Sequence, residues 1–145
     1  MKHVAPIIAI AALLLASCQR PAEPPTVSTA SLDPALASLV SKSRQAVSST
    51  PKSDEAWGKL GQALHAAEFL PEAQACYRQA AALDPRSPRW PHLLGVLELA
   101  GDYESGLRHL QRAVELEPQQ LQHRLELGFA CAADRRISDC TANSS

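Results

Sequence analysis

Residues 83–95, LDPRSPRWPHLLG, place three prolines inside a chain that is otherwise rich in leucine and alanine. Pro85 predicts the end of a helix at Leu83, because proline has no amide proton and its ring clashes with the preceding helical turn. Pro88 fits the first position of a following helix, where the missing amide proton costs no hydrogen bond. Pro91 still falls in the first turn, whose amides have no partners within the helix. The stretch therefore predicts two helices that meet at a sharp corner.

This corner recurs along the chain at a nearly fixed interval. The recurring prolines are Pro51, Pro85 and Pro118, separated by 34 and then 33 residues. An alanine stands five residues before each proline, at Ala46, Ala80 and Ala113. A leucine–glycine pair follows each proline, at residues 60–61, 94–95 and 127–128. Self-similarity of this period indicates stacked helix pairs, in which small residues let the backbones approach closely.

The first unit resembles the tetratricopeptide repeat (TPR). Residues 57–64, WGKLGQAL, match the first-helix pattern of that family, with Leu64 where an aromatic residue usually stands. The matching residues of the second helix and the turn after it are Ala73, Tyr77, Ala80 and Pro85. The second unit keeps Leu94, Gly95, Leu110, Ala113 and Pro118, and its GDYESG segment (residues 101–106) is close to the family's turn between helices. It departs from the pattern at Pro91, Glu98 and Gly106.

The resemblance implies an all-α fold, a short TPR-like α-solenoid of about six antiparallel helices. We expect them at residues 33–49, 54–67, 71–83, 88–100, 103–116 and 120–133. The repeats then occupy residues 51–133, divided into 54–87, 88–120 and a partial unit, 121–133. Residues 33–50 match the second half of a unit whose first half is replaced by a linker. Residues 134–145 are expected to form a polar tail.

The N-terminus has the layout of an export signal. A short basic start precedes an apolar run at residues 4–15, which is too short for a permanent membrane span of roughly 20 residues. The segment LASC at residues 15–18 resembles the lipobox of bacterial lipoproteins. The resemblance implies cleavage of a signal peptide at residues 1–17 and lipidation of Cys18. Gln19 after the cysteine favours the outer membrane, so we expect an envelope protein that is lipid-anchored and faces the periplasm.

Residues 18–32 are rich in proline and serine and have no apolar periodicity, so we expect a flexible linker. The chain carries 14 Lys and Arg against 15 Asp and Glu, which gives no basic face for nucleic acid. We expect no cofactor and no catalysis, because the sequence contains no nucleophile elbow, phosphate loop or metalloprotease motif.

The remaining cysteines and histidines offer an alternative function. Cys76 fits a helix interior as a small apolar residue. Cys131 and Cys140 stand nine residues apart, and in an oxidising envelope they can be bonded or free. Metal or cofactor handling by His65, His92 and Cys76 is the alternative to protein binding.

Protein binding is the main prediction. In TPR proteins the first helices of successive units line a groove that holds a peptide or a helix of a partner protein. The repeat register gives these groove positions: Glu55, Gln62, His65, Arg89, His92, Val96, Leu99, Leu125 and Phe129. The resemblance thus implies a non-catalytic adaptor or accessory subunit with a protein partner in the envelope. For Leu125 and Phe129 the polar tail offers an alternative cover.

Overall fold

The computed structural model describes the backbone of residues 22–142 and the side chains of residues 22–133. The expected signal peptide and Cys18 lie outside these residues. Within them the secondary structure is entirely helical. The helices are α1 (Pro34–Ser49), α2 (Asp54–Ala66), α3 (Leu70–Leu83), α4 (Arg89–Glu98), α5 (Tyr103–Leu116) and α6 (Leu121–Ala142). In the described part of the chain, none of these helices has the length and apolar character needed to span a bilayer.

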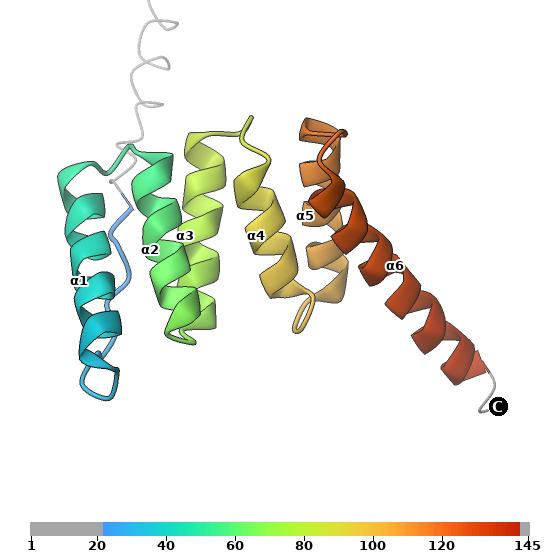
Figure 1. The fold of residues 1–145 in the computed structure, drawn as a ribbon, viewed down its shortest axis with the longest axis horizontal. Coiled ribbons are helices and arrows are strands. Elements are labelled where there is room, and N and C mark those ends of the chain that lie inside the picture. Colours follow the sequence, from blue (N-terminus) through green and yellow to red (C-terminus); the bar gives the residue numbers. More distant parts are fainter. Residues whose placement is uncertain (1–21, 143–145) are drawn as a thin grey trace, which may run out of the picture.

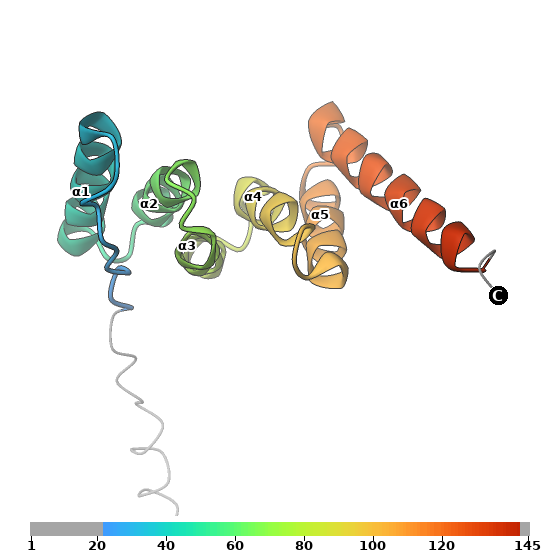
Figure 2. The same ribbon diagram turned by 90° about the horizontal axis from the view of Figure 1, so that it is seen from below.

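The helices stand side by side in chain order, and each packs against the next (Figure 1). Two helix pairs, α2 with α3 and α4 with α5, form the centre of the stack. Seen from below, α2 and α4 lie in one layer and α3 and α5 in a second layer (Figure 2). The expected all-α, TPR-like α-solenoid is therefore confirmed.

Prolines and polar caps set most helix ends close to the expected residues. α3 ends at Leu83, just before Pro85, and α1 begins at Pro34. Asp33 Oδ1 accepts a hydrogen bond from the Ala35 amide (2.8 Å), and Ser53 Oγ accepts one from the Ala56 amide (3.2 Å). These side chains satisfy amides that have no partner inside their helices.

Glycines mark the close crossings inside each helix pair. A Cβ added to Gly61 would lie 2.6 Å from the Tyr77 ring, and one added to Gly95 would lie 2.9 Å from Leu110 Cγ. Both facing side chains are fully buried. A side chain larger than hydrogen has no room there, so the leucine–glycine pairs at residues 60–61 and 94–95 have the packing role that their spacing predicts. Gly128 of the third pair differs, because no described atom comes within 4 Å of an added Cβ.

A third glycine contact joins the two pairs. Trp90 of α4 is buried against Gly58 of α2, where an added Cβ would lie 2.1 Å from the indole ring. The Trp90 indole nitrogen donates a hydrogen bond to Asp54 Oδ2 (3.0 Å). The position of Trp90, one residue earlier than the TPR pattern requires, therefore serves stacking between units.

The departure of Glu98 from the pattern also has a structural role. Its carboxylate is 3% exposed and accepts hydrogen bonds from Arg78 of α3 (2.5 Å) and His109 of α5 (2.8 Å). A buried carboxylate requires such partners, because moving an unpaired charge out of water costs on the order of several kcal/mol. Glu98 thus holds three helices together where Leu64 fills the corresponding space in the first unit.

The N-terminal end of the stack differs from expectation in two ways. Ala46, matched by sequence to Ala80, is exposed, and its neighbour Val47 is fully buried instead. Residues 22–29, expected within a flexible linker, run along α1 without regular secondary structure, and residues 30–32 form a turn before it (Figure 1). Val27 and Leu32 pack against the core, and Arg44 Nη2 donates a hydrogen bond to Thr26 Oγ1 (2.9 Å). Residues 22–32 therefore cover a side of α1.

The C-terminal helix is longer than expected. α6 continues to Ala142, whereas we expected a helix end at Ala133 and a polar tail. No proline or glycine interrupts the chain after Gly128. An α-helix rises 1.5 Å per residue, so the Cys131 and Cys140 Cα atoms lie about 14 Å apart, beyond the roughly 7 Å that a disulfide allows. A continuous helix therefore favours the free form of the two alternatives, and the exposed Cys131 is free.

Candidate functional site

The first helices of the successive units, α2, α4 and α6, form one face of the molecule, here called the α2–α4–α6 face (Figure 2). A polar network joins its α2 and α4 parts. Arg89 of α4 pairs with Glu55 of α2 (3.1 Å) and donates a hydrogen bond to Gln62 Oε1 (3.3 Å). The Arg89 guanidinium also lies 4.7 Å from the centre of the Trp90 ring. Three predicted groove residues, Glu55, Gln62 and Arg89, are thus brought together and partly satisfy one another.

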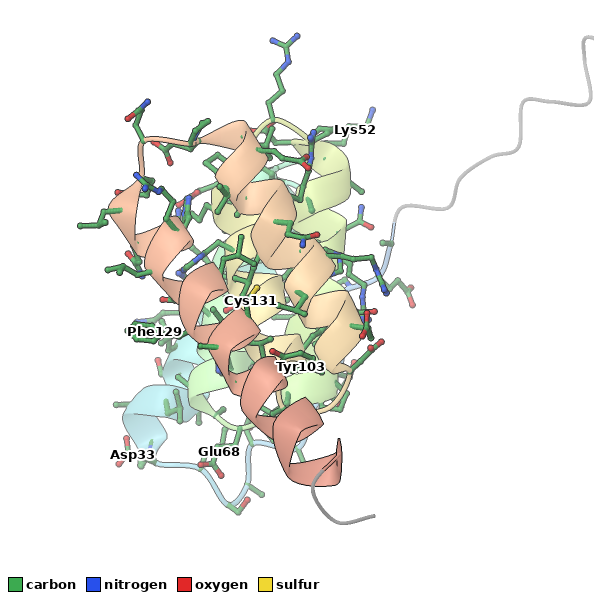
Figure 3. The ribbon with its side chains drawn as sticks, turned by 90° about the vertical axis from the view of Figure 1, so that its right-hand side faces the viewer. Asp33, Lys52, Glu68, Tyr103, Phe129 and Cys131 are labelled. Carbon is green, nitrogen blue, oxygen red and sulfur yellow. The ribbon has the colours of Figure 1, made fainter. Side chains whose placement is uncertain are left out.

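The other end of this face is apolar and exposed. Val96 of α4 is 37% exposed, and Leu125 and Phe129 of α6 are 48% and 72% exposed. Figure 3 shows Phe129 projecting from α6 away from α5. Leu99 instead packs beside Gly106 of α5, so it contributes less surface than its register predicts. The backbone of residues 134–142 continues α6 rather than folding back, and Leu125 and Phe129 stay exposed.

His92 does not line the open face as expected but is buried between α4 and α6. Its side chain is near the Gln122 amide nitrogen (3.5 Å) and Glu126 Oε1 (3.8 Å), and its ring centre lies 4.6 Å from that of His123. Burial lowers the pKa of His92 below its ordinary value of 6.5; Glu126 opposes this shift and His123 adds to it. His92 therefore favours the neutral form.

A cleft of about 310 Å³ opens beside this histidine pair. Its lining comes from α2, α4, α6 and the turn before α6 and is mainly polar: Gln62, Pro88, Arg89, His92, Leu93, Glu117, Gln120, Gln122 and His123. Amide and guanidinium groups of this kind can donate hydrogen bonds to a peptide backbone. The α2–α4–α6 face thus has a polar cleft and also exposed apolar side chains on α4 and α6.

The alternative metal or cofactor site is not assembled. His65 lies edge-on to the Tyr77 ring at 6.4 Å, and Cys76 is fully buried in α3. Burial raises the pKa of the Cys76 thiol to about 12, with a further contribution from Glu72, so the thiolate that metals bind is disfavoured. His92 contacts His123 rather than His65. Among the described residues, no group of three or more histidine, cysteine or acidic side chains is arranged to hold a metal ion.

One residue of the cleft, Gln122, stands in the repeat register of the predicted groove positions but is not among them. Gln122 follows Arg89 by 33 residues, as Arg89 follows Glu55 by 34. His123 and Glu126 had no such signal, because neither matches a recurring mark. Their role depends on the position of α6 against α4, which no single helix pattern reveals.

Comparison with known proteins supports the fold. No protein-family model matches the sequence, and no curated protein does. Among solved structures the chain is similar to MamA, with a TM-score of 0.60 and 20% identity over 65% of this chain and 56% of that one. It is also similar to the first TPR of Spaghetti (RPAP3), bound to the HSP90 peptide SRMEEVD: TM-score 0.61, 18% identity, 65% of this chain and 75% of that one. A chain of the CopN–Scc3 complex matches with a TM-score of 0.58 and 19% identity over 68% of this chain and 59% of that one.

These structures define the architectural class as TPR-like. The chain spans little more than half the length of the MamA chain and of the matched chain in the CopN–Scc3 complex.

Proposed function

We propose that this protein binds another protein on its α2–α4–α6 face and performs no catalysis itself. The observation that carries the proposal is the exposure of Val96, Leu125 and Phe129 on this face. Large apolar side chains left exposed on one face of a protein favour interaction with a partner, because their burial releases water from apolar area. The fold adds support, since one solved structure of this architecture holds a peptide.

The two parts of the face suggest how a partner binds. The exposed apolar side chains would contact an apolar side chain of the partner, and the polar cleft would take part of its backbone. The charge of Arg89 in the cleft is paired with Glu55. We therefore expect apolar contact, rather than charge, to provide most of the affinity.

The proposal includes a lipid anchor at Cys18, which rests on the lipobox resemblance of residues 15–18. Several acyl chains together hold a protein stably on a bilayer. An anchored adaptor meets membrane-bound partners at a raised effective concentration. The expected place is the periplasmic side of a bacterial outer membrane. Replacement of Cys18 by serine should move the protein out of the membrane fraction and abolish its labelling with palmitate.

The test of protein binding uses crosslinking in intact cells and isolation through the C-terminus. We compare Phe129→Glu and Val96→Glu with the control Leu70→Glu, which changes a 41% exposed leucine at the start of α3. The two changes on the α2–α4–α6 face should remove the partner, and the control should retain it. Partners that survive both changes would place the binding site elsewhere.

A further inference from the structure

We propose that the contact between α4 and α6 is a pH-sensitive latch formed by His92 and His123. The two imidazole rings come from different helices and lie 4.6 Å apart, inclined by 44°. The two residues are 7% and 6% exposed. The latch regulates the proposed binding face, so its biological consequence, but not its existence, rests on the proposed function.

Few hydrogen-bond partners surround the two imidazole rings. The Nδ1 atoms of both rings are buried and have no hydrogen-bond partner among the described residues. The nearest carboxylate oxygens are Glu126 Oε1, 3.8 Å from His92 Nε2, and Glu117 Oε2, 3.9 Å from His123 Nδ1. Both distances exceed those of a charge-assisted hydrogen bond, roughly 2.7–2.9 Å.

The groups around the pair come from each element that lines the cleft. α2 contributes the neutral Gln62, α4 contributes Arg89, the turn before α6 contributes Glu117, and α6 contributes Gln122 and Glu126. Arg89 is paired with Glu55, and its positive charge does not favour a further cation. Glu126 favours protonation of His92, whereas burial and the second imidazole oppose it.

The pKa shift of His92 sets the direction of the pH effect. Burial lowers its pKa when α6 is docked, and release of α6 would return the pKa toward 6.5. Between these two values the undocked form binds more protons, so acid favours undocking. Docking is therefore strongest above pH 6.5 and weakens as the pH falls toward the lowered pKa. Below that value the weakening stops, because both forms are then protonated.

Undocking would alter the binding face directly. Leu125 and Phe129 lie on α6, and Val96 lies on α4. When α6 moves away from α4, Leu125 and Phe129 change position relative to Val96. Acidification would therefore release a partner held on this face.

The test measures the latch without any partner. Hydrogen–deuterium exchange of the full chain is followed from pH 7.5 to pH 5 and corrected for the intrinsic pH dependence of exchange. Amides of residues 121–133 should lose protection below pH 6.5, by up to about tenfold per pH unit for each proton taken up. Amides of α2 and α3 should keep their protection over the same range.

Two variants separate the latch from general acid sensitivity. Replacement of both histidines by phenylalanine, an aromatic ring that does not titrate, should remove the pH dependence of α6 exchange. His92→Gln provides a smaller change should the double variant fold poorly, and it should also flatten the profile, because it removes the histidine whose pKa burial lowers. The control His65→Gln, outside the pair, should retain the wild-type profile.

A flat profile for α6 in the wild-type chain, or equal losses in α2 and α3, would overturn the latch. A pH profile unchanged in His92→Gln would do the same. Because no partner is present, failure of the latch leaves protein binding at neutral pH untouched. Conversely, a working latch in a chain that captures no partner would count against the proposed function alone.

Discussion

At the scale of single residues, Gly58 has the tightest packing role. Its missing side chain leaves space for the indole of Trp90, which joins the second helix pair to the first. The sequence did not mark Gly58, because the residues that follow it by 34 and 67 positions are His92 and Leu125 rather than glycines. Among the described residues this contact joins one pair of units, so it leaves no repeated mark in the sequence.

Gly58→Ala should destabilise the protein. The added methyl group would lie 2.1 Å from the buried Trp90 ring, which has no free space to move into. We expect a loss of about 2 kcal/mol in the free energy of unfolding, measured by urea denaturation, as is typical for overpacking of a core.

Gly128→Ala is the matched control. Gly128 also lies inside a helix, but no described atom comes within 4 Å of an added Cβ. Alanine has the higher helix propensity, so stability should rise by up to about 1 kcal/mol. Equal effects of the two substitutions would mean that Trp90 does not pack on Gly58.

At the scale of the elements, the turn between α2 and α3 contains a strained residue. Glu68 has φ 63°, a left-handed conformation that favours glycine. The turn is closed by hydrogen bonds from the Glu68 amide to the His65 carbonyl (3.0 Å) and from the Phe69 amide to the Leu64 carbonyl (2.9 Å). The conformation is therefore held by the helix end on which the turn is built.

Glu68→Gly should raise the free energy of unfolding by about 0.5–1 kcal/mol, because glycine adopts this φ without steric cost. Thermal and urea unfolding would measure the gain. Ala66→Gly, two residues earlier in the regular helix, should instead lose about 1 kcal/mol. A loss of stability in Glu68→Gly would show that the residue is not left-handed in solution.

The length of α6 gives a second prediction at this scale. A continuous helix keeps Cys131 and Cys140 about 14 Å apart. Peptide mapping of oxidised, unreduced protein should therefore find no bond between these two cysteines within one chain. Recovery of that linked peptide in high yield would mean that α6 ends before Cys140.

Helix boundaries followed from the sequence wherever proline or a capping residue fixes them. Pro34 and Pro85 placed the start of α1 and the end of α3 within one residue. The end of α6 was missed, because nothing in that stretch stops a helix. Exposure at the candidate site was harder to predict than helix positions. His92 and Val96 share a helix and a predicted role, yet α6 buries the first and leaves the second open.

At the scale of the whole molecule, the two ends of the stack differ. Residues 22–32 cover part of α1, whereas α6 keeps Leu121, Leu125 and Phe129 exposed. A terminal helix of a repeat array normally has a polar outer face, which keeps the array soluble. The apolar surface of α6 therefore favours contact with another protein at this end.

Site-specific photo-crosslinking in living cells tests the binding face most directly. A photoreactive phenylalanine analogue is placed at Val96 or Phe129 on the α2–α4–α6 face, and at Arg112 on α5 in the second layer. The account predicts adducts of one defined mass from the first two positions and none from Arg112. Adducts from Arg112 alone, or equal adducts from all three positions, would contradict it.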